Sequence, residues 1–114
     1  MAEVRKNPLP GGSWSAMFIT SETVSGNKAC LGYSHFTPGS VSDPIAHETE
    51  EFVFVAKGEG ELRTEKGAVE FVAGDALHIP AQTFHWIDNT GSKEIVMIFG
   101  FPAPDYPTTE KHSS

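Results

Sequence analysis

The sequence predicts an all-β protein, folded as an antiparallel sandwich or a jelly-roll barrel. Three observations lead to this fold class. Apolar and polar residues alternate in several short segments, which is the side-chain period of a β-strand. Glycine-containing turns separate those segments, and no stretch of about ten residues has an apolar stripe at helical spacing. At 114 residues, the chain is long enough for one domain with a buried core.

The first two predicted strands are 16–20 and 28–36. Ser25-Gly26-Asn27 lies between them, and Pro38-Gly39 follows the second. Glycine and asparagine tolerate the backbone angles of tight turns, and proline cannot donate to a sheet ladder. These residues therefore set the limits of both segments.

The middle of the chain contains three predicted strands, 51–56, 60–64 and 68–72. The segment 51–56 reads EFVFVA and alternates most clearly. Gly58 separates it from the next strand, and Lys66-Gly67 separates the second strand from the third. Short strands joined by glycine turns are typical of antiparallel hairpins.

The last three predicted strands are 76–79, 84–88 and 94–101. Gly74-Asp75 precedes the first of them, and Asn89-Thr90-Gly91 separates the other two. We place one domain over 14–101. Prolines and polar residues interrupt 1–13 and 102–114, so we expect a flexible N-terminal arm and a flexible C-terminal tail.

Charge and composition exclude several classes of partner. The chain has 8 Lys+Arg against 15 Asp+Glu, a formal net charge of −7, and no basic cluster, so we expect no nucleic-acid partner. No apolar run approaches the roughly 20 residues of a membrane helix, so no membrane partner is expected. The start MAEVRKNPLPGG lacks the apolar centre of a secretory signal. The single Cys30 cannot form an internal disulfide, which favours a reducing cytoplasm.

Two segments contain residues suited to chemistry. His47 and Glu51 are four positions apart, so on an extended strand both side chains leave the same face. That face also carries apolar residues, among which an unpaired charge is costly. A divalent cation would satisfy both groups. Thr83, His85 and Ile87 share a face in the same way, and a barrel can bring His85 beside His47 and Glu51.

These segments resemble the paired motifs of the cupin superfamily of small β-barrels. The first motif, with Gly, His-x-His, Glu and Gly, is matched at Gly39, His47, Glu51 and Gly58. The second, with Gly, Pro-x-Gly-x-x-His and Asn, is matched at Gly74, Pro80, His85 and Asn89. The resemblance covers about residues 30–101 and implies a single double-stranded β-helix, the jelly-roll cupin barrel.

The chain departs from the cupin pattern at two positions. Ile45 stands where the first metal-binding histidine of the family belongs, and Gln82 replaces the glycine of the second motif. The resemblance then implies a metal site of His47, Glu51 and His85. Two imidazoles and one carboxylate leave positions open on a transition metal such as Fe²⁺, Mn²⁺, Ni²⁺ or Zn²⁺.

We therefore expect a metal-dependent enzyme of oxygenase, isomerase or decarboxylase/lyase type, acting on a small organic molecule. A carbonyl, enol or aromatic acid fits best. Three alternatives stay open. In a metal-free barrel, Glu51 would act as the catalytic general base. The barrel could bind or sense a small ligand without turnover. It could also be purely structural.

The other candidate residues have simpler explanations. His78 is favoured as an ordinary surface or sheet histidine, His35 is undecided, and His112 needs no role. Cys30 is expected to be a small core or sheet residue. Phe52 and Phe54 lie out of phase with Glu51, so they would face outward. Outward phenylalanines favour a homodimer.

Overall fold

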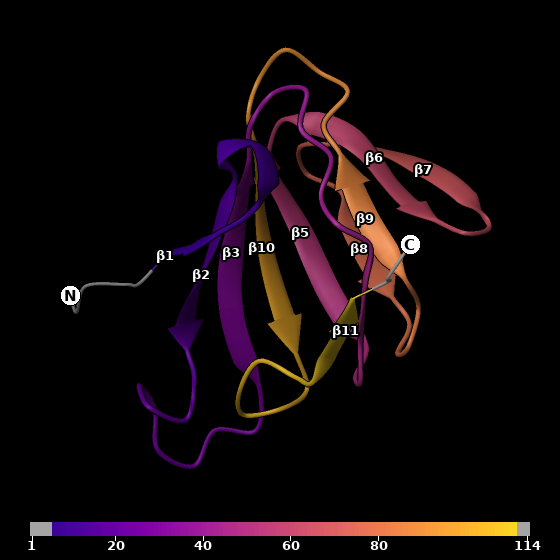
Figure 1. Cartoon of the computed structure of the whole chain (residues 1–114). Helices are drawn as coiled ribbons and strands as arrows, with labels where there is room; N and C mark the ends of the chain where they lie inside the picture. Colours follow the sequence, from indigo (N-terminus) through magenta and orange to yellow (C-terminus); the bar gives the residue numbers. More distant parts are fainter. Residues whose placement is uncertain (1–5, 112–114) are drawn as a thin grey trace.

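The computed structural model describes residues 6–111, which form two antiparallel β-sheets and contain no α-helix (Figure 1). The first sheet has six strands in the order β1 (Lys6–Pro8), β2 (Trp14–Ile19), β3 (Cys30–Phe36), β10 (Ile95–Phe101), β5 (Glu51–Lys57) and β8 (Ala76–Ile79). The second has five, in the order β11 (Thr109–Lys111), β4 (Ile45–His47), β9 (His85–Asp88), β6 (Glu59–Thr64) and β7 (Gly67–Val72). A short 3-10 helix spans Pro10–Gly12. The prediction of an all-β jelly-roll fold is confirmed.

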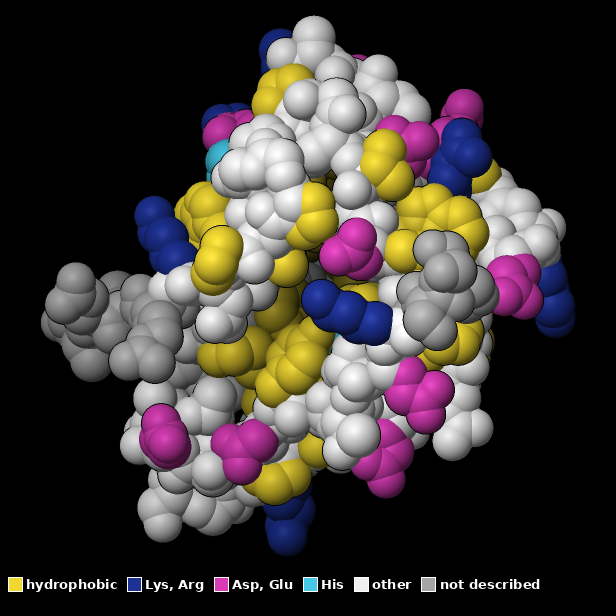
Figure 2. Space-filling model, in the orientation of Figure 1, with side chains coloured by type: hydrophobic (Ala, Val, Ile, Leu, Met, Phe, Trp, Pro, Cys, Tyr) yellow, Lys and Arg dark blue, Asp and Glu magenta, His cyan; other side chains and the backbone are white. Residues whose placement is uncertain are grey.

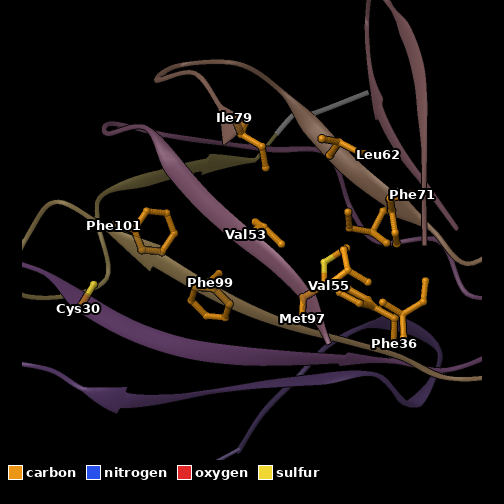
Figure 3. Close-up of a cluster of buried hydrophobic side chains, with 12 residues drawn as sticks. Cys30, Phe36, Val53, Val55, Leu62, Phe71, Ile79, Met97, Phe99 and Phe101 are labelled. Atoms are coloured by element: carbon orange, nitrogen blue, oxygen red, sulfur yellow. The ribbon is translucent and has the colours of Figure 1, made fainter. Parts of the chain in front are cut away.

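The core lies between the two sheets, because alternate residues of each strand point inward. In β5, Val53 and Val55 are buried whereas Phe52 and Phe54 are exposed. In β10, the inward set of Ile95, Met97, Phe99 and Phe101 is buried. Figure 3 shows these side chains meeting residues of the opposite sheet, including Leu62 and Phe71. Burial of this apolar surface is the main favourable term in folding.

Gly58 illustrates why the turn between β5 and β6 needs glycine. Its φ is +88°, in the left-handed region. A Cβ atom at this position would run into the backbone of Glu94 and Ile95. The close approach allows β6 to turn away from β5 into the other sheet (Figure 1).

The structure differs from the sequence prediction at three short strands. β1 and β11 lie within the expected arm and tail, and β4 lies where no strand was assigned. Each has three residues, too few to display an alternation. They form because backbone groups pair along the edges of β2, β4 and β9. The residues 1–5 and 112–114 of the arm and tail lie outside the described part of the chain.

The outer face of the six-stranded sheet carries a row of aromatic side chains. Trp14 packs edge-on against Tyr33, with 4.9 Å between ring centroids, and Phe18 stacks on Tyr33 at 4.5 Å. Phe52 and Phe54 continue the face with 51% and 49% exposure. The prediction that these two phenylalanines point away from the interior is confirmed. No helix able to cross a lipid bilayer occurs in residues 6–111.

Candidate metal centre

Three predicted site residues meet between the sheets: His47, Glu51 and His85. Glu51 Oε1 lies 3.2 Å from His47 Nε2 and 3.5 Å from His85 Nε2. One donor atom from each residue lies within 4.8 Å of the others, and all three residues are buried. The structure thus brings together groups that are up to 38 positions apart in sequence.

The two sheets share the site. His47 ends β4 and His85 begins β9 in the five-stranded sheet, whereas Glu51 begins β5 in the six-stranded sheet. The expectation that one extended strand carries both His47 and Glu51 is therefore wrong. The chain turns through Glu48–Glu50 and passes from one sheet to the other. Both side chains still point inward because the two sheets face each other.

Hydrogen bonds fix the tautomer of His85. Its Nδ1 lies 2.9 Å from the carbonyl oxygen of Thr83, which can only accept. Nδ1 therefore carries the proton and donates it. In the neutral imidazole, Nε2 then presents a lone pair toward Glu51.

Two successive hydrogen bonds fix the tautomer of His47. The Thr109 hydroxyl donates to the carbonyl oxygen of Pro107 at 2.9 Å, so its oxygen is left to accept from His47 Nδ1 at 2.7 Å. His47 Nε2 then also presents a lone pair toward Glu51. Hydrogen bonds of this kind from the second ring nitrogen orient metal-binding histidines in proteins.

Glu51 Oε1 is buried and has no hydrogen-bond partner among the described residues. Burial alone would raise the pKa of Glu51, but His47 and His85 outweigh it and hold that pKa below its ordinary value. Positive charge or a donated hydrogen beside a carboxylate favours its ionised form. One proton satisfies one imidazole–carboxylate pair, whereas a divalent ion satisfies both lone pairs and the carboxylate together. The donor set therefore fits a borderline transition metal.

A cavity of about 170 Å³ opens from this cluster to the surface. Figure 2 shows the hollow, with a hydrophobic interior and charged side chains at its edge. Its walls are mainly apolar and come from both sheets, with Val53, Ile79 and Phe99 from the six-stranded sheet and Ile45 and Ile87 from the five-stranded sheet. A cavity of this size holds about one substituted aromatic ring.

Both departures from the cupin pattern have a clear position. Ile45 is paired with His85 and lines the cavity, so the predicted inward register is confirmed. Its side chain supplies no donor. Gln82 has φ +59°, in the left-handed region, and its N–H donates to the His47 carbonyl oxygen at 2.7 Å. The turn thus keeps its shape without the glycine of the motif.

The remaining histidines and Asn89 lie outside the cluster. His78 Nε2 contacts Glu50 Oε1 at 2.9 Å on an exposed face, as the simpler explanation predicted. His35 contacts Glu94 at 2.6 Å and stacks on Trp14. His112 lies outside the described residues. The buried Asn89 side-chain amide nitrogen lies within hydrogen-bond distance of three backbone carbonyl oxygens, between which its two N–H groups are shared, and so holds the turn in place.

Three residues of the C-terminal segment contribute to the site and were missed by sequence reasoning. Thr109 holds His47, and Tyr106 and Lys111 line the cavity. The Tyr106 ring packs edge-on against His47, with 5.4 Å between centroids. Desolvation and the Glu51 charge raise the pKa of Tyr106 to about 12. No motif in the sequence marked these residues.

Comparison with known proteins identifies the family. Residues 32–101 match the Cupin domain family, which is more than half of the chain. The chain belongs to the cupin family. In this cupin, the matched region contains all three clustered residues and ends before β11.

A curated relative of this cupin is described as "Polyketide synthase CurC" from Streptomyces cyaneus. It is 29% identical over 98 residues, which are 85% of this chain and 63% of the relative. The chain thus spans less than two thirds of that relative's length.

Two solved structures resemble the fold. The polyketide cyclase RemF from Streptomyces resistomycificus has a TM-score of 0.81 at 18% identity, over 98% of this chain and 82% of its own. The oxalate decarboxylase of Lactobacillus farciminis, in complex with formate, has a TM-score of 0.82 at 18% identity. That match covers 95% of this chain and 33% of the decarboxylase. At these identities, the likeness concerns the fold.

Proposed function

We propose that this cupin is a metal-dependent enzyme that acts on a small carbonyl or enol compound. His47, Glu51 and His85 would hold one divalent ion of Fe²⁺, Mn²⁺, Ni²⁺ or Zn²⁺. Such an ion polarises a carbonyl oxygen and favours loss of a proton from the neighbouring carbon.

One observation carries this proposal. Glu51 Oε1 is buried without a hydrogen-bond partner in residues 6–111, and two Nε2 lone pairs point toward it. Three acceptors that converge in a buried site need a cation. The oxygen and nitrogen donors, together with the missing fourth ligand at Ile45, leave coordination positions for substrate oxygen.

For the reaction, we propose ring closure of a linear β-keto compound. The curated relative is described as a polyketide synthase and one structural neighbour as a polyketide cyclase, which supports this choice. Aldol closure forms one carbon–carbon bond, and the dehydration that follows releases one water, so no external oxidant is needed. Val53, Met97 and Phe99 would hold the chain in a folded shape and keep water from the reacting carbon.

The first test is the metal content of untagged protein purified without chelator. We expect about one equivalent of a transition metal in the wild-type protein and a large loss in Glu51→Gln and His85→Ala. His78→Ala is the matched control because it removes a histidine–glutamate contact on the outer face. It should keep the metal. Protein that stays below about a tenth of an equivalent after soaking in these ions would overturn the proposed centre.

The second test is turnover. The metal-loaded protein is incubated with a linear β-triketo ester, and the appearance of an aromatic product is followed by ultraviolet absorbance. Oxygen uptake and decarboxylation of β-keto acids are measured in parallel. Stoichiometric binding of these compounds without product would favour the non-catalytic binding barrel.

A further inference from the structure

The C-terminal strand β11 places a positive charge at the cavity. In the β11–β4 pair, Thr109 lies opposite His47 and Lys111 lies opposite Ile45. Residues two apart on a strand share a face. Because the Thr109 hydroxyl reaches the His47 ring, that face is the inner one. Lys111 accordingly lines the cavity together with Ile45 and His47.

Among residues 6–111, Lys111 is the only lysine or arginine that lines this cavity. It forms no ion pair with any residue in 6–111. By contrast, Lys57 and Arg63 are bound to neighbouring carboxylates: Lys57 Nζ lies 2.8 Å from Glu94 and an Arg63 nitrogen lies 2.7 Å from Glu61. Within the described part of the chain, no carboxylate neutralises the Lys111 ammonium.

The negative net charge of the protein makes a positive side chain at the cavity important for binding an anionic ligand. A chain with a net charge of −7 repels an anionic ligand at a distance. Asp43, which also lines the cavity, and Glu51 add negative charge there. An acidic substrate would need a local cation to offset this field.

We propose that Lys111 binds the carboxylate of an organic acid whose carbonyl or enol oxygen faces His47, Glu51 and His85. This assignment rests on the proposed function and gives it a substrate class, an acid rather than a neutral ketone or ester. A single ammonium suits a carboxylate. A phosphate recruits more donors, such as paired arginines or a run of backbone amides, and the residues of 6–111 that line the cavity include no arginine and no glycine.

Lys111 lies beyond residues 32–101, the region that matches the family. The Thr109–His47 hydrogen bond ties the strand that carries Lys111 to the candidate metal centre. The register of the β11–β4 pair thus places Lys111 beside the candidate metal ligands.

The experiment compares salicylate with salicylamide, which differ in the carboxylate and share the ring and the phenol oxygen. Calorimetry measures both dissociation constants for zinc-loaded and for metal-free full-length protein. We expect the wild-type protein to bind salicylate about fivefold more tightly than salicylamide, as for one partly exposed ion pair. Lys111→Met should abolish that preference and leave salicylamide binding unchanged. Lys111→Arg should retain it.

Lys57→Met is the matched control, since it removes the same charge from the outer surface and should keep the preference. Melting temperature and zinc content of each variant check that fold and metal centre persist. The assignment is wrong if Lys111→Met still binds salicylate more tightly than salicylamide. It is also wrong if the wild-type protein shows no such preference. If the metal-free protein prefers salicylate and loses that preference in Lys111→Met, acid binding by Lys111 is supported even where the metal tests fail. This outcome separates the Lys111 proposal from the proposed metal centre.

Discussion

The Thr109 hydroxyl and the His47 ring lie 2.7 Å apart, although 62 positions separate the two residues in the chain. The contact joins a strand outside the matched family region to a candidate metal ligand. Since the Thr109 proton is donated to Pro107, the direction of the bond to His47 is fixed. One threonine thereby determines which imidazole nitrogen faces Glu51.

Thr109→Val should weaken metal binding. Valine has the shape of threonine without the hydroxyl, so His47 Nδ1–H loses its acceptor. Loss of such a partner typically lowers metal affinity about tenfold or more. Competition with a chromophoric chelator measures the change, and nitrogen-15 NMR reports the His47 tautomer. Thr109→Ser keeps the hydroxyl and should retain both the affinity and the tautomer. Equal affinity in the valine and serine variants would exclude this role.

Ile45→His should tighten metal retention. Ile45 lines the cavity beside His85, so a histidine at this position can supply a fourth donor. We expect metal affinity to rise about tenfold or more, with dissociation into excess chelator as the measurement. Ile45→Asn, which is polar but a poor ligand for these ions, is the control. If the histidine variant releases metal as fast as the wild-type protein, the ligand set is wrong.

Gln82→Gly should stabilise the fold. Gln82 occupies the left-handed region at φ +59°, which is unfavourable for a residue with a Cβ atom. We expect an increase in the free energy of unfolding of about 0.5 kcal/mol, or about 3 °C in melting temperature. Calorimetry measures it. Gln82→Ala keeps the strain and removes the amide, so it should not gain stability. A glycine variant that melts below the alanine variant would contradict the argument.

Cys30 should resist alkylation in the folded protein. It is 3% exposed, and desolvation raises its pKa despite a backbone hydrogen bond from Phe101. The folded state thus favours the neutral thiol. The resulting stabilisation is complete below the thiol pKa of the unfolded chain, and it is lost as the pH rises through the higher folded value. Iodoacetamide labelling at pH 8, followed by mass spectrometry, should be at least about tenfold slower than in urea. Equal rates would mean that the thiol is accessible.

The homodimer stays a prediction, and the exposed aromatic face gives its test. Phe54→Glu places a charge among apolar side chains on the outer face of the six-stranded sheet. If two copies associate there, the variant should be monomeric by light scattering where the wild-type protein is a dimer. Val69→Glu is the control, because Val69 is 57% exposed on β7 of the other sheet. Dissociation by both substitutions, or by Val69→Glu alone, would place the interface elsewhere.

The parts of the fold that could be predicted are those that show an alternation. β5, β9 and β10 each have one buried and one outer face, and their sequences display it. β1 and β11 could not be found in this way. With three residues each, they pair through backbone groups, which every sequence possesses.

The same physical limit applies to the site. The cupin-like motif positions of His47, Glu51 and His85 were sufficient to propose a cluster, which the structure brings together, although the expectation of one extended strand was wrong. Thr109 and Lys111 stand in a polar, proline-interrupted segment that resembles an ordinary tail. Their contribution depends on a register with β4 that only the folded chain defines.

Because Glu51 belongs to the six-stranded sheet and both histidines belong to the five-stranded sheet, an ion held by all three would cross-link the two layers of the protein. Binding to the folded chain alone then couples metal occupancy to unfolding. A free metal concentration a hundredfold above the dissociation constant adds about 2.7 kcal/mol to the free energy of unfolding. The heat resistance of this small protein should accordingly follow the metal supply of its surroundings, and a chelator should lower the melting temperature before any residue is changed.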